Sequence, residues 1–216
     1  SIKEGLIANK INKIFGIFNG TSNYILSSMD TEKSNFNDTL NKAKNLGYSE
    51  ANPKSDLNGD DVAAKVKILS ALSFNSYINN NIHIEGIKNI DYEDIKNINK
   101  LGYKIKLLGF SEIIKNKLFQ RVHPTLVRKT SYIASVNGVL NAVILDGKPI
   151  GRNIIQGEGA GPSATTSALI SDLSSILRGN IKFPFAISEK KREKLISGKI
   201  SELYFSSYIR LDVTDK

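Results

Sequence analysis

Residues 139–155 read VLNAVILDGKPIGRNII, and this stretch decides the fold class. Its two apolar runs, 139–145 and 149–155, lie on either side of Asp146-Gly147-Lys148. A short polar segment with a glycine between two apolar, β-branched runs is typical of a β-hairpin. The stretch therefore predicts two antiparallel strands in the second half of the chain.

Further strand-like runs surround this hairpin, whereas most helical patterns come earlier in the chain. Residues 103–111 and 117–122 predict a second strand pair, and residues 11–18 predict an earlier strand. Helices first and antiparallel strands later favour an α+β fold over a doubly wound sheet. The predicted helices cover 2–8, 23–29, 36–46, 60–74, 92–98 and 163–177, and the alternation in 208–216 predicts a last strand.

The composition excludes several classes of protein. The 216 residues are 40% hydrophobic and include no Cys and two His, which excludes disulfides, a thiolate nucleophile and a histidine-rich metal site. No apolar stretch approaches the roughly 18 residues that cross a bilayer, so we expect a cytoplasmic protein. The net charge is +9, but only Lys190-Lys191-Arg192 forms a tight basic run. This pattern favours a solvated surface over a nucleic-acid site, and no membrane contact is expected.

The segment 47–65 gathers several carboxylates just before and within a predicted helix. Asp61 and Lys65 are four residues apart and share one face of that helix. One interpretation is a favourable charge at the helix N-terminus plus a simple ion pair. The other is a loop of carboxylates that binds an ammonium group beside a lysine that transfers protons. Spacing alone favours the first interpretation.

Two other polar turns could contact a ligand. Residues 157–161 (GEGAG) lie between a strand and a helix, where glycines allow close approach and free N–H groups attract anions. Pro162 breaks the dinucleotide-binding fingerprint, so a tight turn and a ligand contact remain equal alternatives. Residues 19–24 (NGTSNY) can cap a helix or hold a carboxylate, and capping is the favoured interpretation.

Taken together, three motifs resemble homoserine dehydrogenase. They are FGIFNGTSNYIL at 15–26, the GYSE…DLNGDDVAAK string at 47–65, and the glycines of 157–161. Asn52 and Ala64 are small departures from the family's usual residues. The resemblance implies Lys65 as the proton-transferring residue; Glu50, Asp56 and Asp61 at the substrate; Gly47, Glu50 and Gly161 at the cofactor; and no metal ligand.

The resemblance also implies an architecture and an activity. The family oxidises L-homoserine to L-aspartate 4-semialdehyde, and reverses that reaction, with NADP or NAD in threonine, methionine and isoleucine biosynthesis. We therefore expect a mixed sheet covered by helices on one face, forming a catalytic and dimerisation domain over 1–187. Residues 188–203 are expected to form a linker and 204–216 the first strand of a regulatory ACT domain.

The resemblance further implies a fragment that lacks an upstream nucleotide-binding domain and has little activity alone. Strands within 103–155 are expected to form a homodimer interface. The alternative function is a non-catalytic module that binds an amino acid or regulates an enzyme.

Overall fold

The computed structural model describes every residue except 1, 3, 181–184, 186, 212 and 214–216. The described chain contains one seven-stranded sheet, in the order β2-β4-β3-β1-β5-β6, with β7 also paired to β4. The strands are β1 (Lys10–Ile17), β2 (His83–Ile84), β3 (Tyr103–Ile114), β4 (Lys117–Arg128), β5 (Leu140–Lys148), β6 (Gly151–Glu158) and β7 (Ile196–Ser197).

The sheet is mixed. Its long strands β6, β5, β1, β3 and β4 pair antiparallel, whereas the two-residue strands β2 and β7 run parallel to β4. The first strand, β1, inserts between β3 and β5, because Phe15 pairs with Phe110 on one side and with Ile144 on the other. β1 is therefore an interior strand of the sheet, and its last residue, Ile17, is buried.

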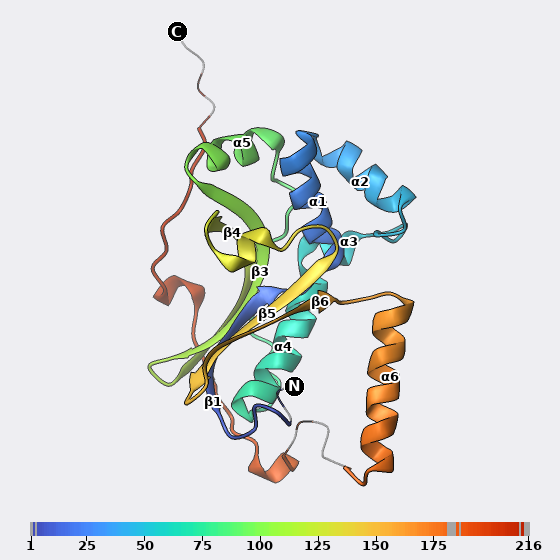
Figure 1. Cartoon of the computed structure of the whole chain (residues 1–216). Helices are drawn as coiled ribbons and strands as arrows, with labels where there is room; N and C mark the ends of the chain where they lie inside the picture. The colour runs from blue at the N-terminus through green and yellow to red at the C-terminus, as the bar shows by residue number, and fades with distance from the viewer. Residues whose placement is uncertain (1, 3, 181–184, 186, 212, 214–216) are drawn as a thin grey trace.

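The helices pack mainly on one face of this sheet (Figure 1). On that face, Val66 of the fourth helix contacts the same apolar cluster as Leu107 of β3 and Val122 of β4. The prediction of an α+β fold with a mixed sheet covered by helices on one face is confirmed. The helices are α1 (Gly20–Glu32), α2 (Phe36–Asn45), α3 (Lys54–Asn58), α4 (Asp60–Phe74), α5 (Tyr92–Lys100) and α6 (Pro162–Leu177), with 3₁₀ turns η1 (Tyr132–Ser135), η2 (Glu189–Lys191) and η3 (Ile200–Glu202).

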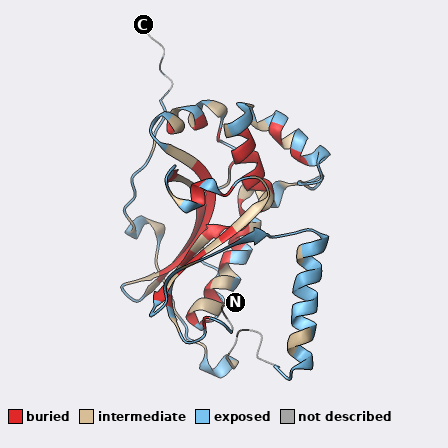
Figure 2. Cartoon of the chain, viewed as in Figure 1, coloured by how far each residue is buried: buried red, intermediate tan, exposed pale blue. Residues whose placement is uncertain are grey.

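Buried residues concentrate in the sheet strands and in α1 (Figure 2). The second face of the sheet has its own apolar cluster, where Leu108 and Ile144 contact Ile133 of η1. In contrast, α6 stands apart from the sheet in Figure 1 and has no buried residue. The core that positions the central strands is therefore built without α6.

The structure corrects several element predictions. The described residues of 2–8 form turns rather than a helix, and 204–211 have no regular secondary structure rather than a strand. The rest of the predicted last strand includes residues 212 and 214–216, which lie outside the described residues. The hairpin turn lies at Pro149-Ile150, because Asp146 still pairs with Arg152 in the β5–β6 ladder.

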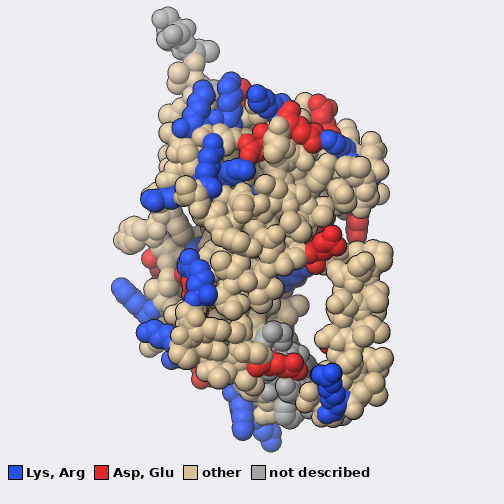
Figure 3. All heavy atoms as spheres, in the orientation of Figure 1, with Lys and Arg blue, Asp and Glu red and all other residues tan. Residues whose placement is uncertain are grey.

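The basic residues do not gather in one place on the face seen in Figure 3. Lys and Arg side chains form several separate groups there, with Asp and Glu between some of them. This distribution agrees with a solvated surface. Among the described residues, the helices are too short or too polar to cross a membrane.

Candidate active site

Asn19 occupies the junction between β1 and α1, and its side chain gathers two carboxylates. The residue is 6% exposed and is the N-cap of α1, where its Oδ1 accepts a hydrogen bond of 2.8 Å from the Ser22 N–H. Its Nδ2 donates to Asp56 Oδ1 at 2.8 Å and to Asp61 Oδ2 at 2.9 Å. One amide group therefore joins three elements of the chain.

The two carboxylates reach the same amide because α3 and α4 meet at a single glycine. Gly59 ends α3 and precedes α4 with a φ of 90°, a conformation that L side chains rarely adopt. A Cβ at this position would also lie 3.1 Å from Val122 and 3.2 Å from Ile84. The sharp turn places Asp56 of α3 beside Asp61, which lies in the first turn of α4.

Lys65 completes the cluster from the next turn of α4. Its Nζ donates to Asp61 Oδ2 at 2.8 Å and to the Phe18 carbonyl oxygen at 2.9 Å. Its third proton has no partner among the described residues. Because 45% of the Lys65 side chain and 30% of the Asp61 side chain are exposed, a ligand can approach both groups. The predicted i,i+4 pair is thus part of a larger cluster that includes Asn19 and Asp56.

The segment 47–50 is attached to the same helix start. Thr21 Oγ1 donates to the Tyr48 carbonyl oxygen at 2.7 Å, and the rings of Tyr48 and Tyr24 lie 5.1 Å apart. Ser22 Oγ donates to the Asp56 carbonyl oxygen at 2.8 Å. The hydroxyl groups of α1 therefore fix the backbone on both sides of the predicted substrate-binding segment.

Three predicted site residues are not joined to this cluster by any contact in the described chain. Glu50 is exposed, and its carboxylate has no hydrogen-bond or ion-pair partner among the described residues. Gly47 follows α2 with a φ of 74°, and Gly161 precedes α6 with a φ of 104°. A Cβ at either glycine would meet nothing within 4 Å, so both positions face open space.

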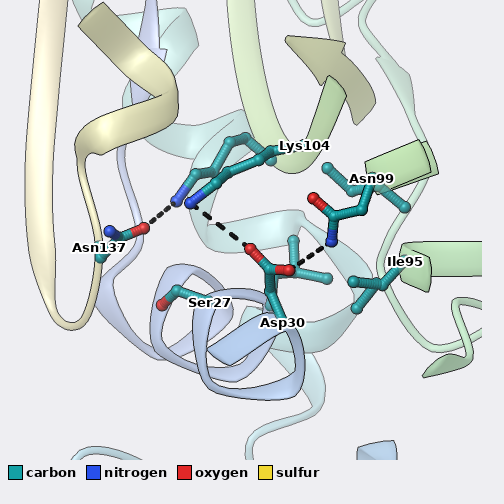
Figure 4. A pocket seen from close by; sticks show the side chains of 9 residues that line it. Ser27, Asp30, Ile95, Asn99, Lys104 and Asn137 are labelled. Carbon is teal, nitrogen blue, oxygen red and sulfur yellow. Dashed lines mark hydrogen bonds and ion pairs between the residues drawn. The ribbon is translucent and has the colours of Figure 1, made fainter. Parts of the chain in front are cut away.

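A second polar cluster lies next to α1 and was not predicted. Lys106 of β3 is 1% exposed, and its Nζ donates to Asn23 Oδ1 at 3.0 Å, Val136 O at 2.5 Å and Asn137 Oδ1 at 3.1 Å. Burial, with a smaller effect of the Lys104 charge, lowers the pKa of the Lys106 ammonium to about 8. The cluster borders a small cavity, about 10 Å³ in volume, in which Asp30 pairs with Lys104 and Asn99 (Figure 4).

Sequence signals for the two missed residues exist but are weak. The turn at residues 19–24 favours capping on sequence grounds, and Asn19 does cap α1. What the sequence could not show is that its amide also reaches Asp56 and Asp61, 37 and 42 residues away. Lys106 interrupts the apolar run of β3, which is a signal for a buried, hydrogen-bonded lysine. Within the described chain, no group of His, Cys, Asp or Glu is arranged to hold a metal ion.

Comparison with known proteins identifies the family. The model of the homoserine dehydrogenase family matches residues 1–174. The chain belongs to the homoserine dehydrogenase family. It is similar to the homoserine dehydrogenase of Helicobacter pylori, with 38% identity over 217 residues, which cover 100% of this chain and 51% of the relative. The Neisseria gonorrhoeae enzyme is 44% identical over 179 residues, which cover 82% of this chain and 41% of the relative.

Solved structures of homoserine dehydrogenases share the fold. A structure from Thiobacillus denitrificans has a TM-score of 0.84 and 39% identity, over 90% of this chain and 47% of that one. A hyperthermophilic archaeal homoserine dehydrogenase mutant, solved in complex with NADPH, has a TM-score of 0.69 and 25% identity over 85% of this chain and 51% of that one. This chain therefore spans about half the length of the relatives that it matches.

Proposed function

We propose that this chain is the substrate-binding, catalytic portion of a homoserine dehydrogenase. The reaction is the oxidation of L-homoserine to L-aspartate 4-semialdehyde, and its reverse, in threonine, methionine and isoleucine biosynthesis. The observation that carries this proposal is the cluster of Asn19, Asp56, Asp61 and Lys65, in which three elements bring carboxylates and an accessible lysine together. Membership of the family indicates which reaction is catalysed, and the cluster contains the side chains that this reaction requires.

Lys65 is the residue that moves the proton. Its partly exposed Nζ is held by Asp61 and by the Phe18 carbonyl, which leaves one N–H direction open toward a ligand. In reduction, the ammonium group donates a proton to the developing alkoxide at C4; in oxidation, the neutral amine accepts the proton of the homoserine hydroxyl. The two hydrogen bonds fix the direction of this transfer.

The carboxylates bind and orient the substrate. Asp56 uses Oδ1 to accept from Asn19, whereas its Oδ2 is without a partner among the described residues and can accept from the α-ammonium group of homoserine. Asp61 lies between this ammonium group and Lys65. Glu50 is on the segment that Thr21 attaches to α1, so a bound amino acid can draw its free carboxylate toward the cluster.

NADP or NAD supplies the hydride acceptor in oxidation and the hydride donor in reduction. Gly47, Glu50 and Gly161 are the residues of this chain that would contact it. The two glycines fit that role, since both have positive φ and leave open space where a side chain would otherwise obstruct a ligand. The remaining contacts would come from a nucleotide-binding domain outside these 216 residues.

The domain and partner assignments form part of the same proposal. Residues 1–187 constitute the catalytic and dimerisation domain, 188–203 a linker, and 204–216 the start of an ACT domain. Strands within 103–155 form the interface of a cytoplasmic homodimer, supported by the exposed apolar side chains of Ile154 and Ile155 on β6, the last strand in the sheet order.

The deciding experiment measures homoserine-dependent formation of NADPH or NADH by the protein encoded by the full reading frame. Lys65→Ala should lower kcat by about 10²- to 10⁴-fold, the usual contribution of a general acid–base group, with a small effect on the KM for homoserine. Lys67→Ala, two residues along the same helix, is the matched control and should keep the parental kcat. Glu50→Ala should chiefly raise the KM for homoserine.

Two outcomes contradict the proposal. Unchanged kcat in Lys65→Ala removes the proton-transfer assignment. A full-length protein that binds homoserine but shows no turnover with either cofactor instead supports a non-catalytic amino-acid-binding module.

A further inference from the structure

We infer that Asn19 is a positioning residue for the substrate carboxylates, and that its amide holds Asp56 and Asp61 in the arrangement that binds the amino acid. This inference rests on the proposed function of the cluster. In this inference Asn19 contacts neither the reacting atoms nor the cofactor. It acts on substrate binding through Asp56 and Asp61.

The orientation of the Asn19 amide is determined by its own surroundings. Its Oδ1 accepts from the Ser22 N–H at 2.8 Å, and a backbone N–H cannot pair with the amide NH₂. The two protons of Nδ2 must therefore face away from α1, toward Asp56 Oδ1 and Asp61 Oδ2. All three hydrogen bonds are made at once, so the side chain has no freedom to rotate without losing one.

Helix capping alone does not require asparagine at this position. Ser, Thr and Asp also accept from the N–H groups of a helix start, and Asp91 does so at the start of α5. None of these three residues can accept from the helix and also donate two hydrogen bonds to carboxylates. The bridging contacts, not the cap, specify an amide here.

Asn35 shows how an ordinary cap differs. It caps α2 through Oδ1, which accepts from the Asp38 N–H at 2.9 Å, and its Nδ2 donates to the Asp38 carboxylate at 2.7 Å. Both partners lie in its own helix, and these bonds are exposed. Asn19 is buried, and its amide protons instead reach two other helices, α3 and α4.

The charges explain why this bridge matters. Asp56 and Asp61 accept from one nitrogen atom, so their oxygens lie within a few ångströms and repel each other when both are ionised. Lys65 neutralises Asp61 directly, whereas the side-chain partner of Asp56 among the described residues is the Asn19 amide. Without this amide, Asp56 is free to turn away from Asp61 and from the substrate.

The test compares Asn19→Ser and Asn19→Asp with the matched cap variants Asn35→Ser and Asn35→Asp in the full-length enzyme. Both replacements keep a capping side chain, so folding is checked by thermal unfolding. Asn19→Ser should raise the KM for homoserine roughly ten- to a hundredfold, the scale expected for a misplaced binding group, while the KM for the cofactor stays unchanged. The Asn35 variants should keep both KM values.

Asn19→Asp adds a pH signature that a purely structural role does not produce. A third carboxylate makes it harder to ionise all the carboxyl groups of the cluster at once. The acidic limb of the profile of kcat/KM against pH should therefore move to higher pH. Asn19→Ser should leave this limb in place. If the two Asn19 variants match the Asn35 variants in KM and in pH profile, the inference is wrong. The same holds if both KM values rise together, because that indicates general loss of structure.

The two proposals fail in different ways. A wild-type enzyme without homoserine turnover contradicts the proposed function and this inference together. An active wild type, an impaired Lys65→Ala variant and unaffected Asn19 variants contradict the inference alone. If Asn19→Asp does not fold, the KM values of Asn19→Ser for homoserine and for the cofactor still test the inference.

Discussion

Gly16 shows how a single residue position constrains the strands that support the site. It faces Gly109 across the β1–β3 pair, and a Cβ added to Gly16 would overlap the carbonyl oxygen of Ala142 in β5. Gly16 lies two residues before Phe18, whose carbonyl oxygen accepts from Lys65. The close approach of β1 and β5 therefore requires glycine at this position.

Gly16→Ala should lower the free energy of unfolding by about 3 kcal/mol or more, because backbone atoms of β5 cannot move aside without breaking the ladder. Gly157→Ala is the control, since Gly157 also lies in a strand but a Cβ there meets nothing within 4 Å. That variant should change stability by less than about 1 kcal/mol. Urea unfolding of both variants measures the difference, and equal values would show that β1 and β5 can separate without cost.

At the residue scale, the sequence predicted the i,i+4 pair of Asp61 and Lys65 because helical spacing is a local property. It did not predict the contacts of Asn19 with Asp56 and Asp61, because they depend on the left-handed turn at Gly59. Nor did it predict Lys106 as a buried cation, because its three acceptors come from α1 and from the loop before β5. Contacts between elements distant in sequence left no periodic signal.

At the scale of elements, three neighbouring strands are joined by one buried carboxylate. Glu112 of β3 pairs with Lys13 of β1 at 3.0 Å and with Arg121 of β4 at 2.6 Å. Burial opposes ionisation of Glu112, but the hydrogen bonds and charges of Lys13 and Arg121 outweigh it and hold the pKa of the carboxyl below its usual value. Arg121, 6% exposed, also lies over the Phe110 ring.

Glu112→Gln should destabilise the sheet by about 3 kcal/mol near neutral pH, because it leaves the buried Arg121 without its counter-charge. The folded-state pKa of Glu112 lies below the unfolded value of 4.5. The contribution of its ionised carboxylate to the free energy of unfolding is therefore fully present above pH 4.5. The contribution is then lost as the pH falls through the folded-state pKa. The stability difference between wild type and variant should therefore stay constant from pH 7 to 5 and shrink below pH 4.5.

Urea unfolding of both proteins at a series of pH values tests this expectation. Glu93→Gln, which alters an exposed pair with Lys96 on α5, is the control and should change stability by less than about 1 kcal/mol. A Glu112→Gln difference that grows as the pH falls contradicts the direction of the pKa shift.

The sequence predicted most elements but not all of their ends. The strand predicted over 117–122 corresponds to β4, which continues to Arg128 and includes Pro124, paired with Leu107. Proline is tolerated there because, in the described part of the chain, β2 and β7 pair with residues 117–118 and 121–122 and no strand pairs with the outer edge of β4 at Pro124. The predicted helices also did not include α3, whose Leu57 is buried in the apolar cluster between the helices and the sheet.

On the scale of the whole molecule, Lys106 connects the helix layer, the sheet and the loop before β5. Its Nζ contacts Asn23 of α1 and Val136, while its own backbone lies in β3. Asn23 in turn donates to the carbonyl oxygens of Val136, Gly138 and Leu140. Global unfolding breaks this whole arrangement, so the protonation of Lys106 is coupled to the stability of the entire fold.

The direction of that coupling follows from the two pKa values. Burial lowers the pKa of Lys106 to about 8 in the folded state, against 10.5 in the unfolded chain. Between these values the unfolded chain binds the additional proton, so the contribution of Lys106 to stability rises with pH. It is least favourable below pH 8 and reaches its full value above 10.5. From pH 7 to 10 the gain is about 2.5 kcal/mol, at 1.36 kcal/mol for each unit of pKa.

Lys106→Met isolates this effect, because methionine fills similar space and does not titrate. The stability of wild type minus that of Lys106→Met, measured by urea unfolding, should increase by about 2.5 kcal/mol between pH 7 and pH 10. Lys44→Met, at an exposed position of α2, is the control for replacing lysine by methionine and should change stability by less than about 1 kcal/mol. All three proteins share their remaining tyrosines and lysines, so the titration of those groups cancels in the comparison. A difference that stays flat or decreases with pH shows that the buried ammonium group keeps its proton throughout, held by its three oxygen acceptors.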